Sequence, residues 1–513
     1  MKRILDSVHG YISIPKLYMN GIVDTPQFQR LRRIEQTSCR ALFPSARHDR
    51  FIHSLGVYHI GGLIATRLWQ QGLKDDICKE DGTYDKDKLS VIITYLLACL
   101  LHDVGHTPFS HTFEDYFKHN GNQLPQRLAD FISEDKKFFD DFESQFLKKD
   151  NQWGYAAHEL ISAIVAVYYY GTLIKSEEHK FEDKSAKGIP SLLVRMIVGC
   201  KYQDESHSLE NAFIELMHGD VIDADGIDYV CRDVWASGYS TAKVDVKRLI
   251  RSIIIHKTAD NKYELCYDAK VINEIKSVLQ IKAFQNDIIF NHHILALEQY
   301  LLREALKDAA IYHNRIKVDP KMNLEDVRMD AMYRLCDINM YIAEDGITLQ
   351  SGTKIKLPMD DDFISIMKST APQQQTFISQ WFNRQYQWCA IWKTREAFYA
   401  DLSRAQRDDV DTYKGNAWIF TKYSKKCLLE NFNIESSKVL ILDTLDKDKL
   451  RKINAIKVMV EGQVRSYTDI YPKVEDRVQP FFMYIFIPIG FKSRIAEIRS
   501  RLLGEWTNAL NQN

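Results

Sequence analysis

One short run of residues concentrates side chains that bind metals and carry protons. The run HDVGHTPFSH spans residues 102–111 and ends an apolar segment. An imidazole nitrogen suits transition metals and a carboxylate oxygen suits Mg, Mn, Fe or Zn, so the adjacent His102 and Asp103 can both reach one ion. His106 and His111 follow on either side of a proline, after a glycine that lets the backbone bend. The run therefore predicts a cleft that gathers several titratable groups around a metal.

Two further segments carry the same residue types. RHDRFIHSLGV spans residues 47–57 upstream, and GDVIDADGIDY spans residues 219–229 downstream. Together the three segments give the order H…HD…D, which resembles the metal-binding constellation of the HD-domain phosphohydrolases. The segments DSVHG (residues 6–10) and DTPQFQRLR (residues 24–32) are similar to the opening of the deoxynucleoside triphosphate (dNTP) triphosphohydrolases of that group. The clear resemblance covers roughly residues 1–300, and a weaker similarity extends to the C-terminus.

The resemblance implies a single metal centre. The ligands that it implies, brought from three helices, are His53, His102, Asp103 and Asp225. The cofactor is then a divalent metal, one of Mg, Mn, Fe or Zn. Four protein ligands leave positions open for water and a phosphate, and such a metal polarises a phosphoryl oxygen or lowers the pKa of a bound water.

The resemblance also implies which residues act on the phosphate. His106 contacts the α-phosphate or the attacking water. His158 is a general acid or an orienting group, and Glu114 is its carboxylate partner. His111 either supports this group or is catalytic itself. Attack at the α-phosphorus releases a nucleoside and intact triphosphate.

A third set of residues matches positions that hold the substrate in this family. The candidate substrate-binding residues are Gln36, Arg50, Tyr229, Lys282 and Phe290. Arg50 suits a phosphate because its planar guanidinium makes two parallel contacts to phosphate oxygens. Gln36 matches the position that reads the sugar 3′-hydroxyl. Asp233 either lies near the sugar or pairs with Arg232, and the sequence does not decide between these positions.

Several positions depart from the family pattern. Gly226 stands where a basic residue often follows the last ligand, so one phosphate contact is missing or another Lys supplies it. Thr37 replaces an apolar side chain that faces the 2′-hydroxyl in vertebrate members, and Phe290, Asn286 and Lys282 replace their Tyr, His and Arg. A hydroxyl in a pocket wall accommodates polar groups that an apolar wall rejects. The inference to a deoxyribose-only substrate is therefore weakened.

Vertebrate members also bind a nucleotide effector. The positions that match this site are Asp24, Gln29, Arg32, Arg248 and Lys270. Asp268 replaces an Arg at a further position, and a carboxylate there would repel a triphosphate. The alternative is that the segment from Asp24 to Arg32 binds no effector and has a purely structural role, with Asp24 as the N-cap of a helix that begins at Pro26.

Other titratable residues have structural interpretations. The histidines interpreted as ordinary core or surface residues are His48, His59, His207 and His218. Cys99, beside the HD pair, is interpreted as a core residue. The runs Asp140–Asp141 and Asp360–Asp362 are interpreted as solvated loops.

Composition limits the class of protein. The chain has 513 residues, 45% of them apolar and 27% charged, which indicates a globular protein with a substantial core and two lobes. The formal net charge of -1 provides no global basic field for nucleic acid, so nucleic-acid binding is not expected. Nine scattered cysteines without a CxxC pair indicate reduced thiols and a cytoplasmic location. The longest apolar stretch, residues 89–101, is too short to cross a bilayer and predicts a buried core helix, so no membrane association is expected.

The pattern of apolar residues predicts a mainly α protein. Residues 1–320 are expected to form an HD-domain helical bundle, and residues 321–410 a helical extension. Residues 411–513 are expected to form a C-terminal α+β lobe for regulation or assembly, with strands near 438–442, 455–460 and 481–487 and a last helix near 490–509. By resemblance the assembly is a homo-oligomer, a tetramer or larger.

The resulting functional hypothesis is a metal-dependent dNTP triphosphohydrolase that serves nucleotide-pool control or antiphage defence. A second hypothesis is an HD-type phosphodiesterase or nuclease that acts on a cyclic nucleotide or single strands, because the same metal ligands would serve it. A third is a non-catalytic nucleotide sensor that keeps the pocket. The intact set of ligands and the N-terminal segments favour the first hypothesis.

Overall fold

The computed structural model describes residues 1–119, 121–148, 153–176, 187–238, 244–319, 321–371, 376–403, 406–407, 417–443, 450–475 and 482–510. The chain divides into two compact units, and each of them is discontinuous in sequence. The first contains Met1–Lys282, Leu306–Ala371 and Lys449–Val474, and the second contains Ala283–Ala305, Pro372–Asp448 and Glu475–Asn513. The three consecutive ranges expected from the sequence do not coincide with these units.

The fold is mainly α, as the sequence predicts, and the first unit holds the helices that surround the HD run. The longer ones are α3 (Arg50–Leu68), α5 (Lys86–Leu101), α8 (Ala157–Ile174), α10 (Ser208–Met217), α11 (Ala224–Ser237), α13 (Ile272–Phe284) and α15 (Leu324–Leu335). The shorter ones are α1 (Lys16–Tyr18), α2 (Pro26–Gln29), α4 (Lys74–Ile77), α6 (Leu124–Phe131), α7 (Phe138–Phe146), α9 (Pro190–Val198), α12 (Val246–Arg251), α16 (Asn339–Ile342), α17 (Asp360–Lys368) and α22 (Tyr467–Ile470).

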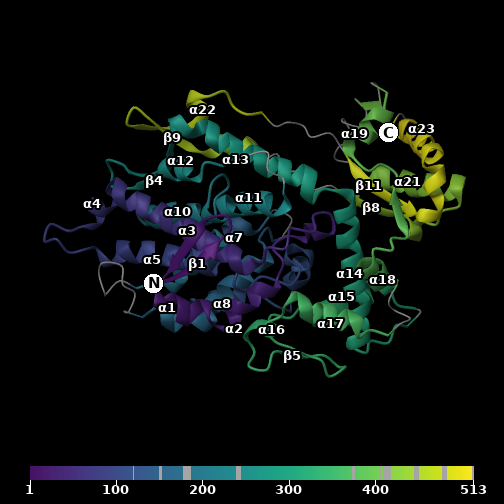
Figure 1. Cartoon of the computed structure of the whole chain (residues 1–513), viewed down its shortest axis with the longest axis horizontal. Coiled ribbons are helices and arrows are strands. Elements are labelled where there is room, and N and C mark those ends of the chain that lie inside the picture. The colour runs from purple at the N-terminus through teal and green to yellow at the C-terminus, as the bar shows by residue number, and fades with distance from the viewer. Residues whose placement is uncertain are drawn as a thin grey trace. The chain divides into compact units, whose positions relative to one another are not determined.

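Helix α5 is the centre of the first unit. All its residues from Leu89 to Leu101 are buried, which confirms the predicted core helix, and it packs against α3, α8, α9 and α10. Helix α3 in turn packs against α11 (Figure 1). Among the described helices, only α8 is long and apolar enough to cross a membrane, and more than half of it is buried inside the protein.

Local sequence explains where the helices of this core begin and end. Asp49 caps α3 by accepting a hydrogen bond from the Ile52 amide, and Asp223 caps α11 by accepting one from the Gly226 amide. Helix α11 ends at Gly238, whose φ of 76° is the left-handed conformation typical of a residue just past a helix end. These caps fix the starts of the two helices that carry candidate ligands.

Two antiparallel hairpins and a four-stranded sheet complete the first unit. The hairpins pair β1 (Lys2–Asp6) with β2 (Gly10–Ile14) and β5 (Ile347–Thr348) with β6 (Lys354–Ile355). The sheet has the order β10-β9-β4-β3, formed by Gln463–Ser466, Lys457–Val460, Tyr263–Asp268 and Ile253–Lys257. Strands β4 and β9 are parallel, with Tyr267 opposite Val458. The predicted strand near 455–460 is confirmed, and it belongs to the sheet of the first unit.

The second unit has a three-stranded antiparallel sheet and helices of its own. The sheet has the order β7-β11-β8, formed by Trp388–Ala390, Met483–Pro488 and Leu440–Asp443. The helices are α18 (Thr376–Asn383), α19 (Arg395–Asp401), α21 (Ala417–Phe432), α23 (Ile495–Leu510) and the first part of α14 (His293–His313). Trp392, Phe486 and Trp506 are buried in one apolar core. The predicted C-terminal α+β lobe is therefore present, without the β9–β10 segment.

Candidate active site

The four candidate metal ligands meet where α3, the end of α5 and the start of α11 come together. The Nε2 atoms of His53 and His102 lie 3.4 Å apart. Asp225 Oδ1 lies 2.9 Å from His53 Nε2 and 3.8 Å from His102 Nε2. Asp103 Oδ2 lies 3.7 and 3.6 Å from the same two nitrogens. Nitrogen and carboxylate donors at these separations fit a single divalent metal of the transition series or Mg.

A buried carboxylate behind His53 orients that ligand. Asp228 Oδ2 lies 2.7 Å from His53 Nδ1, so the Nε2 of His53 faces the other ligands. Asp228 also contacts His9 Nε2 at 2.6 Å and both Nε and Nη2 of Arg232, at 2.8 and 2.9 Å. Arg232 Nη1 donates to Asp6 Oδ2 at 2.8 Å. Burial raises the pKa of Asp228, but Arg232 and the two histidines outweigh burial and hold it well below its usual range.

This network was not assigned from the sequence. The available signal was the spacing of Asp225, Asp228 and Arg232, which places them on neighbouring turns of one helix. The contacts of Asp228 with His9 and His53 span 219 and 175 residues, and they depend on the tertiary fold. The alternative that Asp233 pairs with Arg232 is wrong, because Asp233 Oδ1 lies 2.7 Å from His48 Nε2.

Close approach of α3 and α11 requires a residue without a side chain at position 56. A Cβ atom added to Gly56 would lie 2.0 Å from Asp228 Oδ1 and 2.4 Å from Arg232 Nη2. We expect Gly56→Ala to lower the free energy of unfolding by about 3 kcal/mol or more, because it breaks a buried ion pair. Gly62→Ala on the same helix is the matched control, since a Cβ there has no neighbour within 4 Å. Equal denaturation midpoints for the two variants would contradict the α3–α11 contact.

Asp103 faces an arginine as well as the other ligands. Arg50 Nη1 donates to Asp103 Oδ2 at 2.7 Å, its Nη2 to the Gln36 carbonyl at 3.2 Å, and its Nε to Ser110 Oγ at 3.1 Å. Burial raises the pKa of Asp103, but Arg50 and the nearby histidines hold it well below its usual range. The guanidinium of Arg50 thus keeps a ligand ionised, and its contact with a phosphate stays a prediction.

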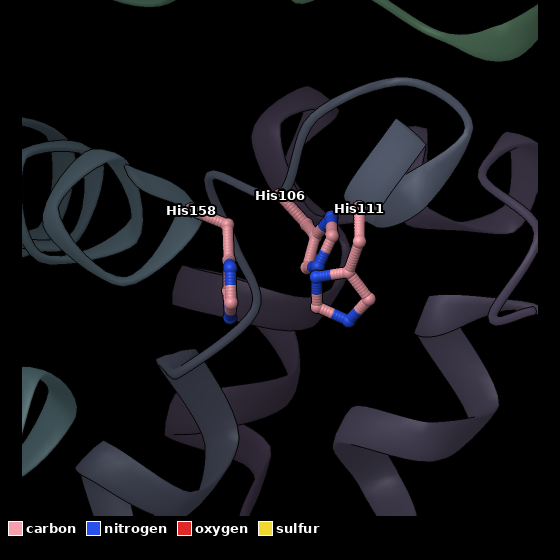
Figure 2. Close-up of side chains that lie close together, drawn as sticks. All are labelled: His106, His111 and His158. Carbon is pink, nitrogen blue, oxygen red and sulfur yellow. The ribbon is translucent and has the colours of Figure 1, made fainter. Parts of the chain in front are cut away.

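The candidate catalytic residues form a second cluster beside the ligands. Figure 2 shows His158 reaching from the start of α8 toward His106 and His111, which belong to the run that follows α5. The rings of His106 and His158 are stacked, with centroids 4.4 Å apart, and His111 lies edge-on to both at 5.2 and 5.0 Å. Glu114, on the short 3-10 helix η6 (Glu114–Lys118), lies 3.0 Å from His158 Nδ1 and 2.9 Å from His111 Nδ1.

The cluster holds opposite charges beside a neutral imidazole. Burial lowers the pKa of His158, but Glu114 outweighs burial and raises it to about 9. Burial raises the pKa of Glu114, and its two histidine partners bring it well below its usual range. Burial and the nearby charge of Arg50 lower the pKa of His106 well below its usual range. At neutral pH, His158 is therefore a proton donor and His106 is a neutral acceptor.

One ring nitrogen from each of these three histidines lies within 4.8 Å of the other two, a spacing that can also hold a metal. The stacked rings of His106 and His158 are tilted by only 27°, so their lone pairs lie in separate, nearly parallel planes. A common ion needs lone pairs that converge, and a protonated His158 offers none. Acid–base chemistry suits this cluster better than a second metal.

Two side chains of the candidate site, one proposed to bind substrate and one proposed to be catalytic, carry a buried polar atom. Gln36 Oε1 and His106 Nε2 are buried and have no hydrogen-bond partner in the part of the chain that the structure describes. Buried polar atoms are normally satisfied, so both atoms suit a bound polar group. Thr37 Oγ1 lies 2.9 Å from Cys39 Sγ.

Lys282 occupies the space that a side chain at position 226 would take. A Cβ atom added to Gly226 would lie 2.6 Å from Lys282 Nζ. The Lys282 amine also lies 5.2 Å from the centre of the Tyr229 ring, within the range of a cation–π contact. The positive charge that is missing at residue 226 is thus supplied from α13. Phe290 belongs to the short π-helix η9 (Gln285–Phe290) in the second unit, and its role stays a prediction.

The residues that match the effector site make contacts within the protein. Arg32 Nε donates to Gln29 Oε1 at 2.9 Å, and Asp24 lies 3.8 Å from Lys2 Nζ. Arg248 pairs with Glu274 at 2.8 Å, and Lys270 donates its backbone amide to Asp268 at 2.9 Å. Asp24 does not cap α2, since the N-cap residue of that helix is Thr25, so this detail of the structural alternative is wrong. The effector role itself stays a prediction.

Two acidic runs differ from the expected solvated loops. Asp141 is buried and pairs with Arg195 at 2.9 Å, and Asp360 is 6% exposed. Their neighbours Asp140 and Asp361 are exposed. Cys99 is fully buried, which confirms its interpretation as a core residue.

Comparison with known proteins defines the class of this site. Residues 50–166 match the family model of the HD domain. The deoxynucleoside triphosphate triphosphohydrolase SAMHD1 homolog of Dictyostelium discoideum is 26% identical over 312 residues, which cover 60% of this chain and 49% of that protein. The SAMHD1 enzyme of Homo sapiens is 40% identical over 118 residues, which cover 23% of this chain and 17% of that protein. The chain thus matches about half, or less, of the length of these relatives.

A solved structure supports the fold. The crystal structure of a hypothetical protein from Aquifex aeolicus superimposes with a TM-score of 0.56 at 20% identity, over 98% of this chain and 99% of that one. Residues 50–166 therefore form an HD domain, which supports a metal-dependent phosphohydrolase activity. The sequence is also similar to proteins named as dNTP triphosphohydrolases.

Proposed function

We propose that the protein hydrolyses dNTPs at the α-phosphorus and releases a nucleoside and intact triphosphate. One observation carries the proposal: the run that begins at His102 supplies two of the four candidate metal ligands, His102 and Asp103, and two histidines of the Glu114-linked cluster, His106 and His111. Asp103 and His106 are close enough for their charges to interact. The similarity to enzymes named as dNTP triphosphohydrolases supports this substrate class among those that an HD site can serve.

The quartet His53, His102, Asp103 and Asp225 would hold the divalent metal. When bound, that metal supplies a Lewis acid for a phosphoryl oxygen and an acidified water. The Asp225 side chain is 39% exposed whereas those of His53 and Asp103 are 1% and 2% exposed, so the ligand set is open to solvent on the side of Asp225. A phosphate approaching from that side meets Lys282 and Tyr229.

The histidine cluster moves the protons of the reaction. The oxygen of water adds to the α-phosphorus, and the bond from that phosphorus to the nucleoside O5′ breaks. His106 accepts the proton of the water at its unpartnered Nε2. His158, held protonated by Glu114, gives a proton to O5′. Exchange with solvent then restores both histidines.

Substrate contacts follow from the same geometry. Lys282 and Arg50 face the negative charge of the phosphates, and Tyr229 lies beside Lys282. The buried Gln36 Oε1 accepts a hydrogen bond from the sugar 3′-hydroxyl. A nucleotide effector at Asp24, Gln29 and Arg32 and a homo-oligomer are further proposals that follow from similarity, and a cytoplasmic location is one that follows from the cysteine pattern.

We expect the product to be inorganic triphosphate. Purified protein is incubated with Mg, Mn, Fe(II) or Zn and with dNTPs, NTPs, cyclic nucleotides and single-stranded DNA, and the products are separated by anion exchange. Nucleoside plus triphosphate from dNTPs is the expected result. Pyrophosphate as the sole inorganic product would contradict the proposal. If only cyclic nucleotides or DNA are cleaved, the protein is a phosphodiesterase or nuclease. If it binds nucleotides without turnover, it is a sensor.

A further inference from the structure

The loop that carries the catalytic histidines contains an unfavourable backbone turn. Phe109 and Ser110 have φ values of 53° and 52°, in the left-handed region that residues with a side chain rarely adopt. Such a conformation is unfavourable for a residue with a side chain, and it persists only where surrounding contacts hold it. Phe109 lies between His106 and His111, so the contacts that hold the turn also place these two rings.

Asp360 makes the contacts that hold this turn. Its Oδ1 accepts a hydrogen bond from the Phe109 amide at 2.6 Å, and its Oδ2 accepts one from the Glu35 amide at 3.0 Å. Its own helix does not use this carboxylate, because Asp362 accepts the hydrogen bond from the Met359 amide at the start of α17. Burial raises the pKa of Asp360 to about 7, so its ionised form is costly and its two backbone hydrogen bonds compensate in part.

A buried arginine ties the same two segments together a second time. Arg30 Nη1 donates to the Pro358 carbonyl at 2.7 Å. Its Nη2 donates to the carbonyls of Val104 and His106 at 3.1 and 2.7 Å. Leu357, beside this junction, has a φ of 52° and is a third left-handed residue. The start of α17 is thus fastened to the catalytic loop on both sides of His106.

The turn is connected to the metal ligands through two side chains. Ser110 Oγ donates to the Glu35 carbonyl and accepts a hydrogen bond from Arg50 Nε. Arg50 in turn donates to the metal ligand Asp103 at 2.7 Å. Asp360 therefore holds the backbone at Glu35 and at Phe109. Ser110 follows Phe109 and donates to the Glu35 carbonyl, so both of these contacts position its side chain.

We propose that Asp360 is a positioning residue of the active site. It fixes the Phe109–Ser110 turn, and through Ser110 and Arg50 it sets the orientation of Asp103, while the same turn places His106 and His111. Among the described residues, the hydrogen bonds of its carboxylate come from backbone amides and not from side chains of the catalytic cluster. Its effect on turnover is therefore exerted through the backbone. The kinetic part of this inference rests on the proposed function.

The test compares Asp360→Asn with Asp361→Asn in the full-length, metal-loaded protein. The side-chain amide introduced by Asp360→Asn can accept one of the two backbone hydrogen bonds and opposes the other with its own N–H groups. We expect hydrogen exchange at the Phe109 or Glu35 amide to accelerate at least about tenfold, and kcat to fall by about ten- to a hundredfold, because small misplacements of catalytic groups have effects of this size. KM and metal content should change less than about twofold. The side chain of Asp361 is exposed and lies 3.7 Å from Arg33, so Asp361→Asn should change neither the amide exchange nor kcat.

Two measurements separate the possible failures. Unchanged exchange at both amides, or a fall in kcat matched by an equal loss of folded protein, would overturn the positioning role. If Asp360→Asn does not fold, Ser110→Ala serves instead, and a full kcat in that folded variant would overturn it. If the wild-type protein releases no triphosphate, the proposed function fails, and amide exchange still decides whether Asp360 holds the turn.

Discussion

Replacing His102 with Ala should remove the bound metal and nearly abolish hydrolysis while the protein stays folded. The His102 Nε2 faces the other ligands, and its Nδ1 lies 3.1 Å from a backbone carbonyl, that of Cys99. The substitution leaves the buried Arg50–Asp103 pair intact, whereas replacing Asp103 would leave a buried cation unpaired. A metal contributes several kcal/mol of transition-state stabilisation, so a loss on the order of a thousandfold is expected.

The matched control for this experiment is His207→Ala. His207 lies outside the site, 3.3 Å from Glu210 and stacked on Tyr202. Metal content by elemental analysis and hydrolysis rate are measured together, with the unfolding midpoint as a check of the fold. A His102→Ala protein that retains one equivalent of metal and wild-type turnover would rule out the quartet.

Replacing His158 with Gln should lower kcat by about a hundred- to ten-thousandfold, the usual contribution of a general acid, without loss of metal. Its ring is held by Glu114 and stacked on His106, and neither contact involves the quartet. Because the pKa of His158 is raised to about 9, its acid form prevails at neutral pH, and wild-type kcat should fall as pH rises through about 9.

Glu114→Gln supplies the corresponding pH test. The carboxylate of Glu114 is the main cause that raises the pKa of His158 against the effect of burial. Without that charge the acid form of His158 is lost at lower pH, so the basic limb of the kcat profile should shift to lower pH. A basic limb that stays in place in Glu114→Gln would show that another group is the acid. Loss of metal from His158→Gln would show that the histidine cluster binds an ion.

The sequence was sufficient for the parts of the site that lie in short motifs. His102, Asp103, His106 and His111 share one run, and the apolar stretch before it, which only Ser90 and Thr94 interrupt, predicted a buried helix that the structure contains. Asp360 was misjudged because a run of three acidic residues is usually solvated. Its burial depends on partners 251 and 325 residues away, which no local pattern encodes.

The division of the chain into two units also depends on contacts between distant segments, in this case between β-strands. The apolar pattern near residues 455–460 predicted a strand, and β9 is that strand. The pattern could not supply its partner, because β9 pairs with β4, about two hundred residues earlier in the chain. A boundary placed at residue 411 therefore assigns β9 and β10 to the wrong unit. Deleting residues 411–513 would remove two strands from the sheet of the unit that holds the active site.

The central claim is attack of water at the α-phosphorus, and isotope transfer tests it most directly. The metal-loaded protein hydrolyses a dNTP in H₂¹⁸O, and the products are examined by phosphorus NMR and mass spectrometry. The account predicts one ¹⁸O atom in a terminal phosphate of inorganic triphosphate and an unlabelled nucleoside. Label in the nucleoside 5′-hydroxyl, or in pyrophosphate or a nucleoside monophosphate in place of triphosphate, would contradict it.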